Sequence, residues 1–256
     1  MLPVDTPFTP WVLGVALVGL AAMLAYRVGR KDRREYQRFK RYHSTARRQE
    51  MFRKWLRESF TWFGGAAVII LVLAWQFIPR MLDQVESWPP TRAFRAFLDQ
   101  GGGFLNGLIV GGSVAFVAGI VLTVFLARNA EEVPTLGDIH ALLPRNRAEL
   151  KYGWGLSINA GVVEELLFRL ALPTLIFGVI GNALVAILLS VLVFGALHSY
   201  QGIGGVIGTF VFGAALMFLF LATGSILWPI LAHALFDLRS LVLIPVAVFK
   251  VHKKVG

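Results

Sequence analysis

Hydrophobic and polar positions follow one another along this chain in long blocks. Seven apolar runs of roughly 18 to 24 residues are separated by polar connections. A helix needs about 20 apolar residues to cross a bilayer, and a helix satisfies its own backbone hydrogen bonds in lipid. The pattern predicts an all-α, polytopic membrane protein with about seven to eight transmembrane helices. The predicted spans are 11–28, 60–78, 104–126, 154–177, 179–198, 203–222 and 226–249.

The connection between the first two spans is strongly basic. Thirteen of the 25 Lys and Arg residues lie between Arg27 and Arg57. Basic loops stay on the cytoplasmic side and attract anionic lipid headgroups. An apolar stripe at helical spacing, which includes Phe52 and Trp55, predicts a helix lying on the cytoplasmic surface. A solvated linker is the simpler alternative.

The remaining connections predict the orientation of the chain. Positive charge follows the first run instead of preceding it, which predicts an uncleaved anchor with its N-terminus outside. Lys250 and Lys254 indicate a cytoplasmic C-terminus, and an odd number of spans satisfies both ends. We interpret residues 79–103 as an outer loop and residues 128–153 as an inner loop. We therefore expect an integral protein of a bacterial plasma membrane.

Composition narrows the class of protein further. Of 256 residues, 56% are hydrophobic and 16% are charged, which is too apolar for a soluble domain. The absence of cysteine excludes disulfides, a Cys nucleophile and Cys-ligated zinc. The net charge of +10 could suggest nucleic acid, but its concentration beside one span points to membrane lipids instead. In the polar inner connection, Glu131, Glu132, Asp138 and His140 fit a solvated surface better than a metal site.

Ionisable residues within the apolar second half are the strongest functional signal. Placing such a side chain at mid-membrane costs at least about 2.5 kcal/mol. These residues should therefore face one another or a polar cavity within the membrane. They are Glu164, Glu165, Arg169, His198, His233 and Asp237.

The spacing of these residues assigns them partners. Glu165 and Arg169 are one helical turn apart and can pair. Glu164 points about 100° away from Glu165, as expected for neighbours in a helix, and is free to act. His233 and Asp237 are also one turn apart, so Asp237 can orient the His233 ring.

These residue types can activate water. A carboxylate and a histidine that converge on one water can take its proton and later protonate a leaving amine. Peptide hydrolysis also requires a donor to the tetrahedral oxyanion, for which His233 is the candidate. Each group also has a purely structural alternative. Glu165 and Arg169 could be an ion pair, His198 could be a helix cap, and His233 with Asp237 could be a packing hydrogen bond.

Three motifs resemble those of the CPBP family, the CAAX-processing and bacteriocin-processing (Abi) intramembrane proteases. Together they cover about residues 150–240, in the right order and in successive apolar segments. They are Glu164-Glu165-x-x-x-Arg169, Phe194-x-x-x-His198 and His233-x-x-x-Asp237. The resemblance predicts an N-terminal membrane region at 1–150 and a CPBP-type catalytic helical core at 151–250.

The resemblance also implies roles. Glu164 and His198 would activate water, His233 and Asp237 would support the oxyanion, and Glu165 with Arg169 would shape the site. Members that trim prenylated Cys-a-a-X tails carry Asn where this chain has Asp237. An ionised Asp would repel an oxyanion, so Asp237 is expected to be protonated or to act only by orienting His233.

The predicted topology conflicts with a single site in one respect. It places His198 near the cytoplasmic end of one span and His233 nearer the outer end of another. One site requires a common depth. Unwinding at Gly202, Gly204 and Gly205, or a re-entrant start at Pro229, could bring the two rings together.

Four functions are compatible with these residues. The first is an endopeptidase acting on a membrane-associated protein or peptide. The second is the same enzyme with zinc held by Glu164, His198 and His233. The third is a non-catalytic membrane scaffold or immunity protein. The fourth is a proton-coupled transporter, although the chain lacks the repeat that many transporters carry.

Overall fold

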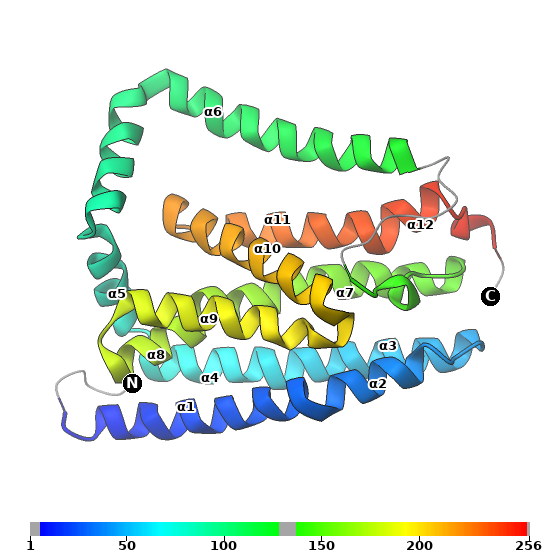
Figure 1. Cartoon of the computed structure of the whole chain (residues 1–256), viewed down its shortest axis with the longest axis horizontal. Coiled ribbons are helices and arrows are strands. Elements are labelled where there is room, and N and C mark those ends of the chain that lie inside the picture. Colours follow the sequence, from blue (N-terminus) through cyan, green and yellow to red (C-terminus); the bar gives the residue numbers. More distant parts are fainter. Residues whose placement is uncertain (1–5, 128–136, 255–256) are drawn as a thin grey trace.

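The computed structural model describes residues 6–127 and 137–254, which form a bundle of helices (Figure 1). Every regular element within these two ranges is helical, which confirms the all-α part of the predicted fold class. The α-helices are α1 (Thr9–Tyr26), α2 (Asp32–Phe39), α3 (Thr45–Glu58), α4 (Gly65–Ala74), α5 (Phe77–Glu86), α6 (Pro89–Ala127), α7 (Arg147–Glu165), α8 (Leu172–Ile180), α9 (Ala183–Leu197), α10 (Gly202–Thr223), α11 (Leu227–Leu238) and α12 (Ile244–Ala247).

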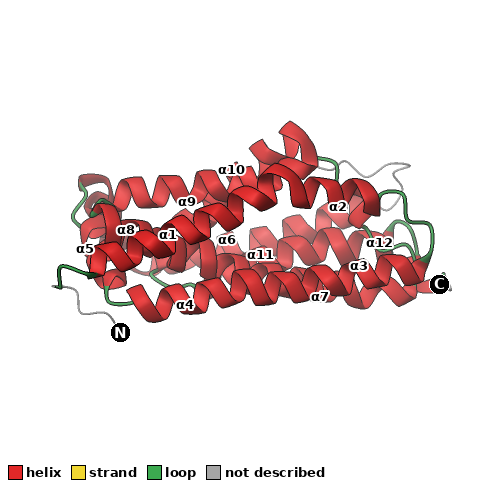
Figure 2. Cartoon of the chain, turned by 90° about the horizontal axis from the view of Figure 1, so that it is seen from below, coloured by secondary structure: helices red, strands yellow, loops and turns green. Residues whose placement is uncertain are grey.

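Several of these helices join into longer rods. Wider π-helical turns connect α1 to α2, α3 to α4, α7 to α8 and α11 to α12 without a break. Most rods run along one axis of the molecule, whereas α5 and the start of α6 cross that axis (Figures 1 and 2). The chain therefore passes back and forth along the bundle, as expected for a polytopic membrane protein.

Within the described residues, four helical stretches are long and apolar enough to cross a membrane. The third stretch contains both α9 and α10, which pack together while running in opposite directions (Figure 1). The stretches are Thr9–Phe39, Thr45–Ala74, Ala183–Thr223 and Leu227–Ala247. A shorter apolar helix covers Val114–Ala127. The seven spans expected from the sequence stay a prediction.

The expected outer loop at 79–103 is wrong, because this segment is helical. α5 occupies its first part and α6 begins at Pro89. A proline has no N–H to lose in the first turn of a helix, so Pro89 starts a helix readily. Gly102 adopts φ 45° and ψ −123° and bends α6. The glycines therefore mark a kink within a helix.

The basic segment forms a helical hairpin of α2 and α3, and its place at the cytoplasmic surface stays a prediction. Its apolar stripe turns inward, where Phe52 is fully buried against Phe39 and Tyr152. Arg48 is also fully buried, and its Nε lies 2.9 Å from Oε1 of Glu149 in α7. The stripe is apolar because it packs on α7, and contact with lipid is not needed to explain it.

The inner connection is shorter than expected. α7 already starts at Arg147, where the Asn146 side chain accepts a hydrogen bond from the Glu149 amide. Glu131 and Glu132 lie outside the described residues. Asp138 is paired with Lys40, which directly follows α2, and its carbonyl accepts a hydrogen bond from the hydroxyl of Tyr36 in α2 at 2.6 Å.

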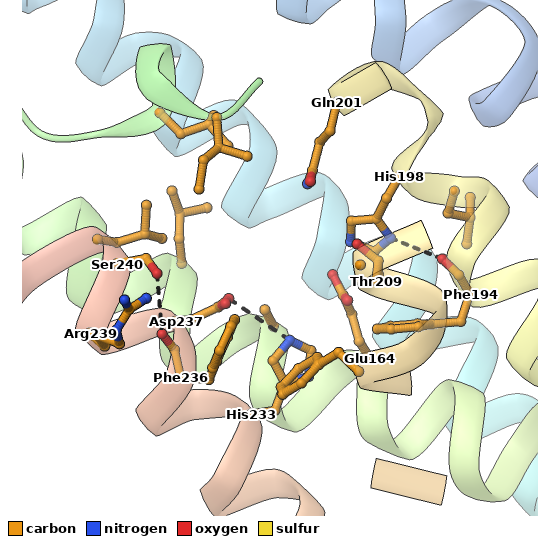
Figure 3. A pocket seen from close by; sticks show the side chains of 18 of the residues that line it. Glu164, Phe194, His198, Gln201, Thr209, His233, Phe236, Asp237, Arg239 and Ser240 are labelled. Atoms are coloured by element: carbon orange, nitrogen blue, oxygen red, sulfur yellow. Dashed lines mark hydrogen bonds and ion pairs between the residues drawn. The ribbon is translucent and has the colours of Figure 1, made fainter. Parts of the chain in front are cut away.

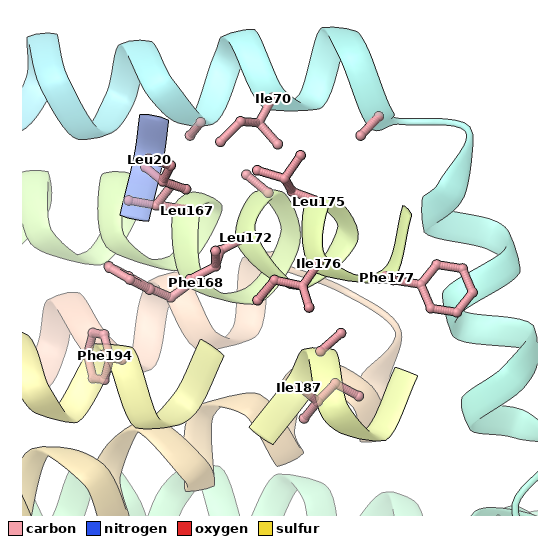
Figure 4. Packing of buried hydrophobic residues seen from close by; sticks show 14 of the residues in the cluster. Leu20, Ile70, Leu167, Phe168, Leu172, Leu175, Ile176, Phe177, Ile187 and Phe194 are labelled. Carbon is pink, nitrogen blue, oxygen red and sulfur yellow. The ribbon is translucent and has the colours of Figure 1, made fainter. Parts of the chain in front are cut away.

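The rod formed by α7 and α8 lies at the centre of the hydrophobic core (Figure 4). Phe168 and Leu175 are almost completely buried. They pack in one cluster with Leu20 of α1, Ile70 of α4 and Ile187 of α9. A helix that is apolar on all sides is expected at such a position. The core thus fixes the rod that carries Glu164, Glu165 and Arg169.

A close approach of α7 and α11 brings two of the predicted motifs together. A Cβ added at Gly161 would lie 2.9 Å from the Ala234 Cβ and 2.9 Å from the Ile230 carbonyl oxygen. Small residues permit such helix contacts in membranes. Gly161 therefore lets His233, the neighbour of Ala234, reach the level of Glu165.

The variant G161A should lower the thermal unfolding midpoint in detergent. The added methyl group overpacks the contact with α11, which costs about 1–3 kcal/mol and exceeds the gain of up to about 1 kcal/mol from replacing a helical glycine. G65A is the matched control, since nothing lies within 4 Å of a Cβ there, and it should not lower the midpoint. An unchanged or higher midpoint for G161A would contradict the close packing.

Candidate active site

A cavity of about 890 Å³ collects four of the predicted side chains. Glu164, His198, His233 and Asp237 all line it (Figure 3). Its wall also includes Tyr36 of α2, together with residues of α6 and α10. Segments on both sides of residue 150 therefore build the cavity. The expected division into a membrane region at 1–150 and a catalytic core at 151–250 stays a prediction.

His198 ends α9 and starts the 3-10 turn His198–Gln201. Its Nδ1 lies 2.9 Å from the carbonyl oxygen of Phe194. A carbonyl can only accept a hydrogen bond, so Nδ1 carries the proton and donates. In the neutral ring, Nε2 is then an acceptor that is available to a water molecule or a substrate.

Glu164 lies on the cavity side of α7. Its carboxylate points toward the His198 ring (Figure 3). Across residues 6–127 and 137–254, Glu164 makes no hydrogen bond and no ion pair. A polar side chain in this position requires a partner, and water in the cavity can supply it.

Glu165 and Arg169 form the predicted pair behind the cavity wall. Both are fully buried, and Nε of Arg169 lies 2.9 Å from Oε2 of Glu165. The other carboxylate oxygen, Oε1, lies 2.8 Å from Nδ1 of His233. The Arg169 guanidinium also stacks on the Phe194 ring, 4.6 Å from its centroid. The pair of Glu165 and Arg169 therefore links its own rod to α11 through His233 and to α9 through Phe194.

The predicted contact between His233 and Asp237 is present only as a long one. Asp237 Oδ2 lies 3.9 Å from His233 Nε2, which is too far for a hydrogen bond. The ring is instead held by Glu165 through Nδ1. Phe212 flanks it at 5.4 Å between ring centroids. Orientation of His233 thus depends on α7 more than on its own helix.

The structure brings together the two histidines, whose relative depth the predicted topology left unresolved. Both rings contact Phe194, at centroid distances of 5.1 Å for His198 and 6.2 Å for His233. The chain does not continue past His198 as a helix, because the 3-10 turn and Gly202, with φ 80°, start α10 there. The two rings consequently lie at one level of the bundle.

The zinc alternative does not fit this geometry. In the described part of the chain, no three His, Asp or Glu side chains lie close enough to hold a metal ion. Glu164, His198 and His233 share the cavity, and the hydrogen bond at Nδ1 of each histidine would leave Nε2 as its possible ligand atom, but the three side chains do not form such a group. We therefore assign no step to a metal.

Several polar residues of the cavity wall were missed at the level of sequence. Asn159, Gln201, Thr209 and Arg239 all line the cavity. Arg239 was detectable, because it is a charged residue inside the predicted span 226–249. Asn159 and Thr209 gave a weaker signal, since uncharged polar residues are common where membrane helices pack.

The variant E165Q should destabilise the fold by about 3–5 kcal/mol, because it leaves the buried Arg169 without a compensating charge. The double variant E165Q/R169M should recover most of this loss. Unfolding by SDS in mixed micelles measures the effect, and E50Q, at an exposed site, is the control. Stability of E165Q equal to that of E50Q would contradict a structural role for the pair.

Comparison with known proteins finds one family model that is similar to part of the chain. Residues 147–239 match the family model described as "Type II CAAX prenyl endopeptidase Rce1-like". The match makes this part of the chain similar to the Rce1-like family. The Rce1-like segment runs from the start of α7 to Arg239 and contains all six predicted site residues. No curated protein and no solved structure matches the chain.

The match confirms the resemblance that the three motifs gave. The Rce1-like family is one of endopeptidases, and residues 147–239 are similar to it. The match covers the cavity residues of α7, α9, α10 and α11 but not those of α2 and α6.

Proposed function

We propose that this protein is an intramembrane endopeptidase that hydrolyses a peptide bond of a membrane-associated protein or peptide. The observation that carries the proposal is the orientation of the Glu164 carboxylate toward the His198 ring in one cavity (Figure 3). The carboxylate makes no bond to a described residue, and Nε2 of His198 is an acceptor in the neutral ring. Water between them would be held by two acceptors.

Water attack follows from this arrangement. Glu164 takes one proton from the water while its oxygen forms a bond to the carbonyl carbon of the substrate. Nε2 of His198 accepts a hydrogen bond from the second O–H and orients the water. The carbonyl oxygen becomes the oxyanion of a tetrahedral intermediate.

Collapse of that intermediate returns the proton. The C–N bond breaks, and the amine leaves with the proton that Glu164 received. His233 can donate from Nε2 to the oxyanion when its ring carries both protons, because Glu165 accepts from Nδ1. Asp237, whose Oδ2 lies 3.9 Å from Nε2, then stabilises the positive charge of the His233 ring. It does not itself donate a hydrogen bond to the oxyanion.

Comparison of membrane protein termini tests the proposal. Membranes from cells that carry the wild-type chain should contain cleaved termini that are missing when E164Q replaces it, and the uncut precursors should accumulate. Cells carrying E50Q should match the wild type. Identical sets of termini for the wild type and E164Q would argue against a peptidase.

A further inference from the structure

Two arginines line the cavity, and the described residues neutralise only one of them. Arg27 forms a double contact with Asp32, in which Nη2 lies 3.0 Å from Oδ1 and Nε lies 3.1 Å from Oδ2. Arg239 makes no ion pair within residues 6–127 and 137–254. The positive charge of Arg239 is therefore not compensated by any of the described residues.

The contacts of Arg239 use a small part of its bonding capacity. Its Nε donates to the Thr123 hydroxyl of α6 at 2.7 Å. Its guanidinium carbon lies 6.0 Å from the centre of the Phe236 ring. A guanidinium carries five N–H donors, so four have no acceptor among the described residues. The planar fork of an arginine matches a carboxylate through two parallel hydrogen bonds.

The acidic residues of the cavity determine where in it a carboxylate can bind. Glu164 and Asp237 line the same space and repel an incoming anion. A carboxylate can bind there favourably only where a cation offsets that repulsion. Arg239 lies two residues beyond Asp237 in the same continuous helix and meets this requirement.

We propose that Arg239 binds a carboxylate group of the peptide substrate and thereby selects substrates that carry one near the cleaved bond. This inference rests on the proposed function, since it takes the cavity as the place where a peptide lies. Six residues separate His233 from Arg239, a rise of about 9 Å along a helix. An extended peptide covers that length with a few residues. The carboxylate is either the free C-terminus or an acidic side chain.

Binding of defined peptides tests the inference without requiring cleavage. The probes are three dansyl-labelled heptapeptides of leucine, alanine and serine. The first ends in a carboxylate and the second in a carboxamide, and the third ends in a carboxamide but contains one glutamate near that end. Fluorescence anisotropy reports their dissociation constants for the full chain in a maltoside detergent, which offers no competing anion. The E164Q background prevents turnover in every sample.

The protein should bind the first probe about tenfold more tightly than the second, as expected for charge-assisted hydrogen bonds. Adding R239Q should abolish this difference, and R239K should keep part of it. R30Q, which removes an exposed cation, should change nothing. T123V should also keep the preference, because it breaks the contact with α6 but retains the guanidinium.

Two results would overturn the inference. One is equal affinity of the protein for the carboxylate probes and the carboxamide probe. The other is a preference that R239Q leaves intact. The third probe identifies the source of the carboxylate: tight binding means that an acidic side chain suffices, and weak binding means that a free C-terminus is needed. The assay records binding alone, so a carboxylate preference together with identical membrane protein termini for the wild type and E164Q would argue against the proposed function and leave the carboxylate-binding role of Arg239 standing.

Discussion

E164Q should reduce kcat by about 10²–10⁴-fold, the range typical for loss of a general base. Glutamine keeps the size of the side chain and its hydrogen-bonding ability but cannot take the proton from water. Substrate binding should change little, since the substitution adds no bulk to the cavity. A substrate identified from accumulated precursors, incubated with the purified chain in detergent, provides the measurement.

Two controls make this result specific to Glu164. E50Q carries the same substitution at an exposed site and should retain wild-type kcat. The unfolding midpoint of E164Q should also stay near the wild-type value, because Glu164 makes no bond to a described residue. If E164Q and H198N both retained full activity, the chain would not be acting as a protease.

H198N should reduce kcat by about 10²–10³-fold, as expected when one of two groups that hold the attacking water is removed. The asparagine amide can take the place of Nδ1 and still donate to the Phe194 carbonyl, which His198 contacts at 2.9 Å. Nothing then occupies the position of Nε2. The variant therefore separates the chemical role of the ring from its role at the end of α9.

The matched control for H198N is H252N, which makes the same replacement at an exposed histidine. The double variant E164Q/H198N should be no slower than the more impaired single variant, because groups that act on one water are not additive. A double variant that multiplied the two losses would show that Glu164 and His198 act in separate steps.

The sequence determined the helical character of this protein and the position of most helices. Apolar runs at 203–222 and 226–249 closely match α10 and the rod of α11 and α12. The reason is physical: lipid-facing helices must be apolar over their whole length, so the run itself marks the helix. Prolines and glycines between residues 79 and 103 did not distinguish a loop from a helix, because in this segment a proline begins a helix and a glycine bends one.

The sequence also determined which charges belong together within one helix. Glu165 and Arg169 are four residues apart, and helix geometry alone brings them within reach. The cost of placing charge in a membrane singled out the residues of the three motifs. The order of these motifs was sufficient to indicate the family that residues 147–239 match.

Only the tertiary structure decided how the motifs meet. The hydrogen bond from His233 to Glu165 joins residues 68 positions apart, and no local periodicity encodes it. The common level of His198 and His233 depends on the reversal at Gly202 and on the close contact at Gly161. The uncompensated charge of Arg239 becomes visible only once its neighbours are known. Spacing along a helix fixes contacts within that helix, whereas contacts between helices depend on which small residues allow two rods to approach.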